Sequence, residues 1–187
     1  MKTGSLLTFL CLLSQTLFSQ DHTAEIVKDI RGKYQEINAN RAAYRKVWAD
    51  RMDETTEGGE VIGYFQKDTV MLIEEYLYAE GGKSCTSIYY DHGAPAFIFL
   101  QMYKYNVPFY DSAFNMSLSE ITTDRSYFYK GKMIRWINPQ NRVLAERDKA
   151  FVENEKGALS LAKELYNDIL LADVRHKPLP AGRVKTK

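Results

Sequence analysis

The spacing of apolar residues predicts a helix near the start of the chain. Ile26, Ile30, Tyr34 and Ile37 follow one another at intervals of four, four and three, which places them on one face of a helix. Thr23 can cap its first turn, and two asparagines shortly after Ile37 are typical of its end. We therefore expect a helix that begins at Thr23 and stops before residue 41.

A block with the patterns of strands follows this helix. Between residues 41 and 52, alternation around Trp48 suits an edge strand, although a continuation of the helix fits as well. Six later segments have strand patterns and are separated by short polar or glycine turns. They are Glu60–Gln66, Val70–Ala79, Ser84–Tyr90, Ala96–Tyr105, Thr122–Tyr129 and Lys132–Ile137.

Three of the turns share one pattern, in which two aromatic residues precede two polar residues, a turn former, one more residue and an apolar residue. The segments are Tyr64–Val70, Tyr89–Pro95 and Tyr127–Met133, and they align without gaps. We interpret them as three related hairpins and call them the aromatic hairpins. Adjacent residues on a strand point to opposite faces, so one ring of each pair can enter the core while the other lies on the outer face. The outer rings then either form a recognition surface or reflect only the general preference of aromatics for strands.

The last part of the chain predicts a long helix and a tail. Asn138 and Pro139 offer a cap and a first-turn proline. One apolar face then runs through Leu144, Phe151, Ala158, Ala162, Leu165 and Ile169. From residue 173 the chain becomes basic and contains two prolines, which is typical of a mobile tail. The order predicts an α+β fold, with an antiparallel meander of about five to six strands flanked by an N-terminal helix and a long C-terminal helix on one face of the sheet.

The first residues change this division of the chain. Lys2, the apolar run Leu6–Leu13 and the small, polar stretch Ser14–Ser19 have the pattern of a cleavable secretory signal. The apolar run is too short to span a bilayer, and no other stretch is long enough, so we expect no transmembrane segment in the mature chain. We predict a signal peptide over residues 1–19, one α+β domain over 20–172 and a flexible basic tail over 173–187. The expected location is periplasmic or secreted.

Composition narrows the function further. The chain has 25 Lys and Arg against 24 Asp and Glu, and removal of residues 1–19 would leave 24 of each sign. A balanced charge argues against a nucleic-acid partner, which normally binds a basic face. Cleavage would also remove Cys11 and leave Cys85 alone, so we expect no intramolecular disulfide.

Parts of the chain resemble known proteins. The aromatic hairpins resemble the short repeats of MORN-type β-hairpin proteins. Four further segments carry a second resemblance: Ile30-Arg31…Tyr34…Ile37-Asn38, Gly58-Gly59-Glu60…Gly63-Tyr64-Phe65, Tyr89-Tyr90-Asp91-His92-Gly93 and Asp124-Arg125-Ser126-Tyr127-Phe128…Gly131-Lys132-Met133-Ile134-Arg135-Trp136. Through them, most of residues 26–138 resembles a group of uncharacterised secreted bacterial proteins. This resemblance implies an envelope or extracellular location and the helix–meander–helix layout, and it carries no activity.

The residue patterns of the common catalytic and metal sites are missing. The three histidines share no helix face, no cysteine pair exists, and we expect neither a metal nor a cofactor. Cys85 and His92 are too far apart on one strand to form a dyad, so Cys85 is expected to be a semi-buried structural thiol. The adjacent Glu74 and Glu75 should point to opposite faces, and we expect no more than surface salt bridges from acidic groups such as these.

Two features favour recognition of a partner. Arginines lie beside aromatic rings in the last hairpin, and the irregular segment Val107–Ser119 carries several aromatics. The candidate binding residues are Tyr90, Phe109, Tyr110, Arg125, Tyr127, Arg135 and Trp136. We expect an exported, non-enzymatic binding domain whose partner is an envelope protein or a glycan. The alternative is a small hydrolase or carbohydrate-active protein with a polar site on the sheet that includes Glu120, Asp124 and Arg125. The short patterns at 68–70 and 111–113 also resemble acceptors for O-glycosylation.

Overall fold

A computed structural model describes residues 4–51 and 54–176, with side chains for 22–51 and 54–174. Helix α1 spans Gly4–Ala39 and helix α2 spans Lys149–His176. Between them lie eight strands, β1 (Arg45–Asp50), β2 (Gly59–Gln66), β3 (Thr69–Ala79), β4 (Gly82–Asp91), β5 (Ala94–Lys104), β6 (Glu120–Tyr129), β7 (Lys132–Ile137) and β8 (Val143–Leu144). They form one sheet in chain order, and every neighbouring pair is antiparallel. The α+β prediction is confirmed, with eight strands rather than five to six.

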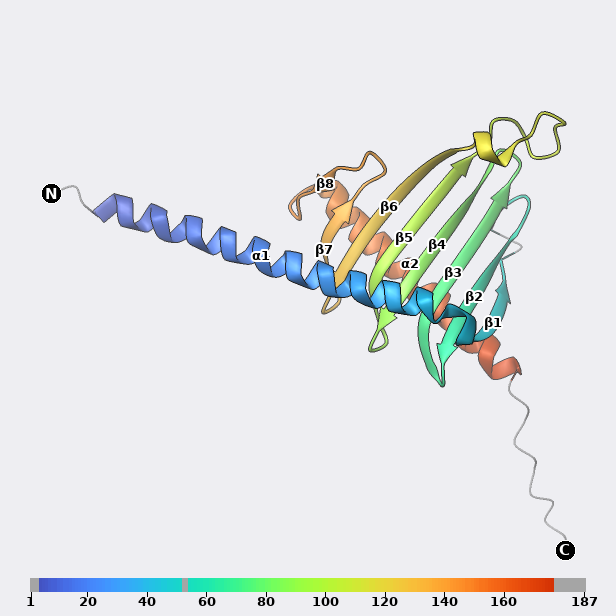
Figure 1. The fold of residues 1–187 in the computed structure, drawn as a ribbon, viewed down its shortest axis with the longest axis horizontal. Coiled ribbons are helices and arrows are strands. Elements are labelled where there is room, and N and C mark those ends of the chain that lie inside the picture. The colour runs from blue at the N-terminus through green and yellow to red at the C-terminus, as the bar shows by residue number, and fades with distance from the viewer. Residues whose placement is uncertain (1–3, 52–53, 177–187) are drawn as a thin grey trace, which may run out of the picture.

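The two helices lie on opposite faces of the sheet, with α1 in front of the strands and α2 behind them in Figure 1. The prediction that both helices cover one face is therefore wrong. The reason is visible on β3, where Leu72 packs with the α1 residues Val27 and Ile30 while its neighbour Ile73 packs with Leu165 of α2. Strands with consecutive apolar residues bury both of their faces, and each face needs its own covering layer.

Two apolar layers result, and we name them after the helix that covers each. The α1 layer consists of Val27, Ile30, Ile37, Tyr44, Tyr64, Leu72, Tyr89, Phe97, Tyr127 and Ile137. The α2 layer includes Val61, Phe65, Val70, Ile73, Ile88, Tyr90, Ile98, Phe128, Met133, Trp136, Phe151, Ala162, Leu165 and Ile169. The predicted apolar face of the C-terminal helix is thus buried from Phe151 onward.

The three aromatic hairpins have the same geometry. Each contains a register shift between its two aromatics, at Tyr64/Phe65, Tyr89/Tyr90 and Tyr127/Phe128. The first ring of each pair lies in the α1 layer and the second in the α2 layer. No ring of these pairs faces solvent as an outer ring, because both faces are covered at this point. The expectation of exposed outer rings is corrected accordingly.

Of the two alternatives for the segment around Trp48, the edge strand is confirmed: it is β1, preceded by a short 3-10 turn over Arg41–Ala43. Two helix boundaries differ from the predictions. Helix α1 continues through Thr23 and does not begin there. The last helix begins at Lys149, not at Asn138, because the Asn138 side chain accepts hydrogen bonds from the backbone of residues 140 and 142. This closes a turn into β8, so Leu144 belongs to a strand.

Glycine allows α2 to cross the sheet closely at β2. A Cβ on Gly63 would lie 2.4 Å from Cγ2 of Ile169. Ile169 has no exposed surface, so it has no open space to move into. The position of α2 beneath β1 and β2 therefore depends on Gly63.

The predictions for the chain ends stay predictions. The predicted signal peptide, residues 1–19, lies outside the side chains that the structure describes. Residues 173–176 of the predicted tail are the last turn of α2, and 177–187 lie outside the described residues. Within the described part of the chain, neither helix is apolar enough over a sufficient length to cross a membrane.

Candidate binding groove

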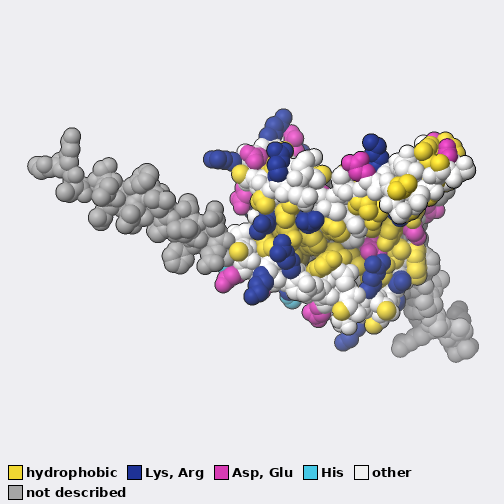
Figure 2. Space-filling view, turned by 45° about the horizontal axis from the view of Figure 1, so that its top comes forward, with side chains coloured by type: hydrophobic (Ala, Val, Ile, Leu, Met, Phe, Trp, Pro, Cys, Tyr) yellow, Lys and Arg dark blue, Asp and Glu magenta, His cyan; other side chains and the backbone are white. Residues whose placement is uncertain are grey.

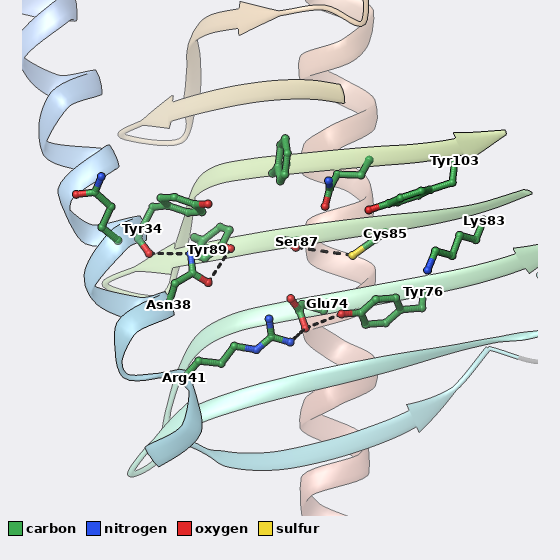
Figure 3. Close-up of a pocket in the computed structure, with 13 residues that line it drawn as sticks. Tyr34, Asn38, Arg41, Glu74, Tyr76, Lys83, Cys85, Ser87, Tyr89 and Tyr103 are labelled. Carbon is green, nitrogen blue, oxygen red and sulfur yellow. Dashed lines mark hydrogen bonds and ion pairs between the residues drawn. The ribbon is translucent and has the colours of Figure 1, made fainter. Parts of the chain in front are cut away.

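Helix α1 covers only part of its face of the sheet, and a groove lies beside it. The groove has a volume of about 510 Å³. Its wall is the end of α1 and its floor is formed by β3, β4 and β5 (Figure 3). The lining residues are Tyr34, Gln35, Asn38, Arg41, Glu74, Tyr76, Lys83, Cys85, Ser87, Tyr89, Phe99, Gln101 and Tyr103.

The floor is set by strand register. Glu74 lies opposite Ser87, which lies opposite Phe99, and the next row on this face joins Tyr76, Cys85 and Gln101. Residues directly opposite one another on antiparallel strands share a face. Each step of two residues along these strands therefore adds one row to the floor of the groove.

A buried carboxylate organises the end of the groove near the 3-10 turn. The Glu74 side chain is 4% exposed, and its Oε2 accepts hydrogen bonds from the hydroxyls of Tyr64 at 2.9 Å and Tyr76 at 3.0 Å. Arg41 donates to the same oxygen and also, at 2.5 Å, to the Tyr64 hydroxyl. A buried carboxylate requires such partners because its desolvation is otherwise costly. The network fixes Arg41 at this end of the groove and Tyr76 on its floor (Figure 3).

Three groups on the floor, Tyr76, Cys85 and Tyr89, have pKa values above their ordinary ones. Burial, followed by the charge of Glu74, raises the pKa of Tyr76 and of the Cys85 thiol. Burial also raises the pKa of Tyr89 to about 12. A protonated, buried thiol is a poor nucleophile, and protonated phenols donate hydrogen bonds. The Tyr76 hydroxyl already donates its one proton to Glu74, and the Tyr89 hydroxyl donates to Asn38. These groups therefore supply neither a base nor a nucleophile.

Positive charge without acidic partners surrounds the groove. A second hollow of about 280 Å³ shares Tyr34, Gln35 and Phe99 with it and adds Arg31 and Arg125. Figure 2 shows hydrophobic side chains along a band across this face, with Lys and Arg beside the band.

The basic side chains along the groove are held by neutral groups. Over the described side chains, none of the salt bridges involves Arg31, Lys83 or Arg125. Lys83 lies over the ring of Tyr103, and Arg125 donates to the hydroxyl of Thr123. Their charges are thus available to an anion.

The seven candidate binding residues do not form one surface. Tyr90 and Trp136 are buried in the α2 layer, where the Tyr90 hydroxyl donates to the carbonyl of residue 162 and Trp136 Nε1 donates to Asp124. Tyr127 is buried in the α1 layer, and Arg125 lies beside it in the second hollow. Arg135 is partly buried and lines a separate hollow next to β8. These residues of the last hairpin therefore do not form a common recognition surface, and only Arg125 lies near the groove, in the second hollow beside it.

The other two candidates lie in the long loop after β5. Phe109 and Tyr110 are 46% and 66% exposed, and their rings meet edge to face at 5.5 Å between centroids. The Tyr110 hydroxyl donates to Glu80. The loop directly follows β5, but neither residue lines the groove.

The alternative polar site does not converge. Asp124 lies on the α2 face, where Trp136 Nε1 and the Ser126 hydroxyl occupy its oxygens. Arg125 points to the opposite face. Glu120 shares the face of Asp124 but is four residues away along β6, a rise of about 13 Å.

The Cys85 thiol is buried, while the His92 side chain is 94% exposed in the β4–β5 turn. Among the described side chains, no group of three or more His, Cys, Asp or Glu could hold a metal ion.

Sequence reasoning missed the residues that organise the groove. Glu74 and Glu75 do point to opposite faces, but both are 3% exposed, and each meets an arginine, Arg41 or Arg51. A detectable signal existed, because two acids follow the apolar run Val70–Ile73 within one strand. Acids inside a strand that is buried on both faces require cationic partners.

Comparison with family models, with curated proteins and with solved structures gave no match. The resemblances to MORN-type repeats and to secreted bacterial proteins therefore stay predictions.

Proposed function

We propose that this chain is an exported, non-enzymatic binding domain that holds an acidic saccharide in the groove beside α1. The observation that carries the proposal is the imbalance of charge in the groove. Its one carboxylate, Glu74, is already held by Arg41 and two tyrosines. Lys83 in the groove and Arg125 in the second hollow beside it lack acidic partners among the described residues. An anion placed there would make charge-assisted contacts with these two cations.

The other lining residues suggest that the ligand contains a ring. Phe99 and Tyr103 present aromatic rings on the floor, and Gln101 lies between them on the same strand. Aromatic faces pack against the apolar faces of flat rings, while amides and hydroxyls bind their polar edges. A volume of about 510 Å³ is in the range of small-molecule sites. An acidic sugar combines the ring, the hydroxyls and the negative charge that these residues suit.

Matched pairs of sugars test the proposal. Titration calorimetry or ligand-detected NMR would compare N-acetylmuramic acid with N-acetylglucosamine, and glucuronic acid with glucose. We expect the acidic member of each pair to bind more tightly, and Arg125→Gln or Lys83→Gln to weaken its binding about tenfold, because one charge-assisted contact is lost. Lys163→Gln, at an exposed position of α2, is the matched control and should leave binding unchanged.

The proposal fails if the acidic and neutral sugars bind equally, or if none of them binds at concentrations of about 10 mM. Export is tested separately by the intact mass of the protein recovered outside the cytoplasm. A mass without residues 1–19 supports the location that we propose, and a mass that includes them contradicts it.

A further inference from the structure

Strand β1 has one unpaired edge whose backbone groups point away from the sheet. The N–H of Arg51 donates to the carbonyl of Gly59, directly after the last paired residues of β1 and β2. Inward and outward backbone groups alternate along a strand, and the β1–β2 register has no shift. The N–H and C=O groups of Lys46, Trp48 and Asp50 therefore point outward.

The side chains of these same three residues share one face. Trp48 lies opposite Ile62 and Lys46 opposite Tyr64, a residue of the α1 layer, so the three side chains lie on the α1 face. All three are exposed, and Trp48 is 53% exposed. The free edge of the sheet thus presents a cation, a large aromatic ring and an anion in that order.

This order is complementary to itself in an antiparallel pairing. If a second copy of β1 lies beside the first with Trp48 opposite Trp48, Lys46 of each copy lies opposite Asp50 of the other. The three facing pairs are those whose backbone groups point outward, so each pair can exchange two backbone hydrogen bonds. Of the symmetric registers, only this one sets Lys46 against Asp50, and opposite charges at facing positions are stabilising.

The other face of this edge is also apolar and exposed. The last turns of α2 leave Leu170, Leu171 and Val174 exposed. Asp173, in the same turns, pairs with Arg45 at the start of β1, so this end of α2 lies beneath the free edge. A long edge strand with exposed apolar groups on both sides is a template for pairing with another chain. In Figure 1, β1 and the end of α2 lie together at one side of the sheet.

We propose that two copies of this chain associate edge to edge through β1, antiparallel and centred on Trp48, so that their sheets become continuous. The inference is independent of the groove, whose lining residues do not include β1. Both grooves would then open on the same face of the combined sheet, because a two-fold axis perpendicular to a sheet preserves its faces.

Charge reversal with rescue tests this register. Sedimentation velocity over a concentration series should show a dimer of the unaltered protein. Lys46→Asp and Asp50→Lys alone should each weaken association about tenfold, since like charges replace opposite ones in both outer pairs. An equimolar mixture of the two variants should form a heterodimer, because Asp at 46 then faces Lys at 50 and Asp at 50 faces Lys at 46. Lys163→Asp, which reverses an exposed charge on α2, is the control and should leave dimerisation unchanged.

A variant that had simply misfolded would not be rescued by mixing, so rescue distinguishes pairing from loss of structure. Three results would overturn the proposal. They are a monomer at about 100 μM, where a micromolar interface would be saturated, single variants that dimerise as well as the unaltered protein, and single variants that are folded by circular dichroism but do not associate when mixed.

Discussion

Glu74 and Glu75 are adjacent carboxylates that are both buried, one on each face of the sheet. Alternation along β3 sends Glu74 toward Arg41 and the groove, and Glu75 toward Arg51 beneath the sheet. Arg51 also contacts Glu164 and Asp168 of α2. One dipeptide thus joins the sheet to the end of α1 on one side and to α2 on the other.

The Glu75 carboxyl predicts a pH dependence of stability. Burial raises its pKa above the ordinary value of 4.5, although Arg51 acts in the opposite direction. The folded protein then keeps the proton to a higher pH than the unfolded chain does, so the unfolded state binds fewer protons in this window. Stability must therefore fall as pH rises through 4.5 and through the raised pKa.

We expect the unaltered protein to lose stability relative to Glu75→Gln as pH rises from about 4 to about 7. Urea unfolding of both proteins at several pH values measures this difference. Glu146→Gln, at an exposed position, should show a constant difference from the unaltered protein. A difference for Glu75→Gln that stays constant, or that changes in the opposite direction, contradicts the assignment.

The aromatic hairpins show what local sequence determines at the scale of elements. Their shared pattern predicted hairpins at the right positions, because turn residues and paired aromatics act locally. The same pattern did not reveal that both rings of each pair are buried. Whether the second face is covered depends on α2, which is distant in sequence, so local periodicity carries no information on it.

The missed strand β8 and the late start of α2 have a similar cause. Asn138 and Pro139 are as suitable for a helix cap as for a turn. The Asn138 side chain instead binds two backbone amides of the turn, and β8 pairs with β7. The local sequence favours a helix start and a turn equally, and the pairing of β8 with β7 selects the turn. Arg125, in the hollow beside the groove, was predicted as a binding residue, whereas Glu74 and Arg41 in the groove required knowledge of which faces are buried.

The turn of the last aromatic hairpin gives a prediction at this scale. Gly131 has a φ of 76°, and nothing lies within 4 Å of a Cβ placed there. Gly131→Ala therefore adds backbone strain without a clash and should cost about 1 kcal/mol of the free energy of unfolding. Gly81→Ala is the matched control, because Gly81 also has open space but no positive φ. Chemical denaturation should show a loss for Gly131→Ala only, and equal effects at both positions would refute the role of the turn.

At the scale of the whole molecule, the sheet separates two layers of unequal extent. The α2 layer spans the sheet from β1 to β7. The α1 layer ends beside the groove, and among the described side chains the apolar α1 residues packed in it lie between Ile26 and Ile37. The groove lies on the part of that face that α1 leaves uncovered.

This arrangement predicts that a chain beginning at Gln20 is as stable as the full chain. It retains every apolar residue of α1 that the structure describes as packed against the sheet. Thermal unfolding of the two forms should give midpoints within about 2 °C, since no described core contact is removed. A chain beginning at Lys33 serves as the contrast, because it lacks Val27 and Ile30 and should melt at least several degrees lower. A large loss for the chain beginning at Gln20 would contradict the prediction.

The position of α2 after all eight strands affects biosynthesis. Each strand can pair with its predecessor as it leaves the ribosome, since sheet order follows chain order. The face that α2 covers, which includes Val61, Ile73 and Ile88, lacks this covering helix until α2 has been made. A nascent chain in which all eight strands precede α2 therefore exposes this apolar face while the sheet is being made, and chaperones bind surfaces of this kind. We predict that this chain is exported. Because α2 packs onto the sheet last, the chain stays incompletely folded for longer, and export machinery can bind it in that state.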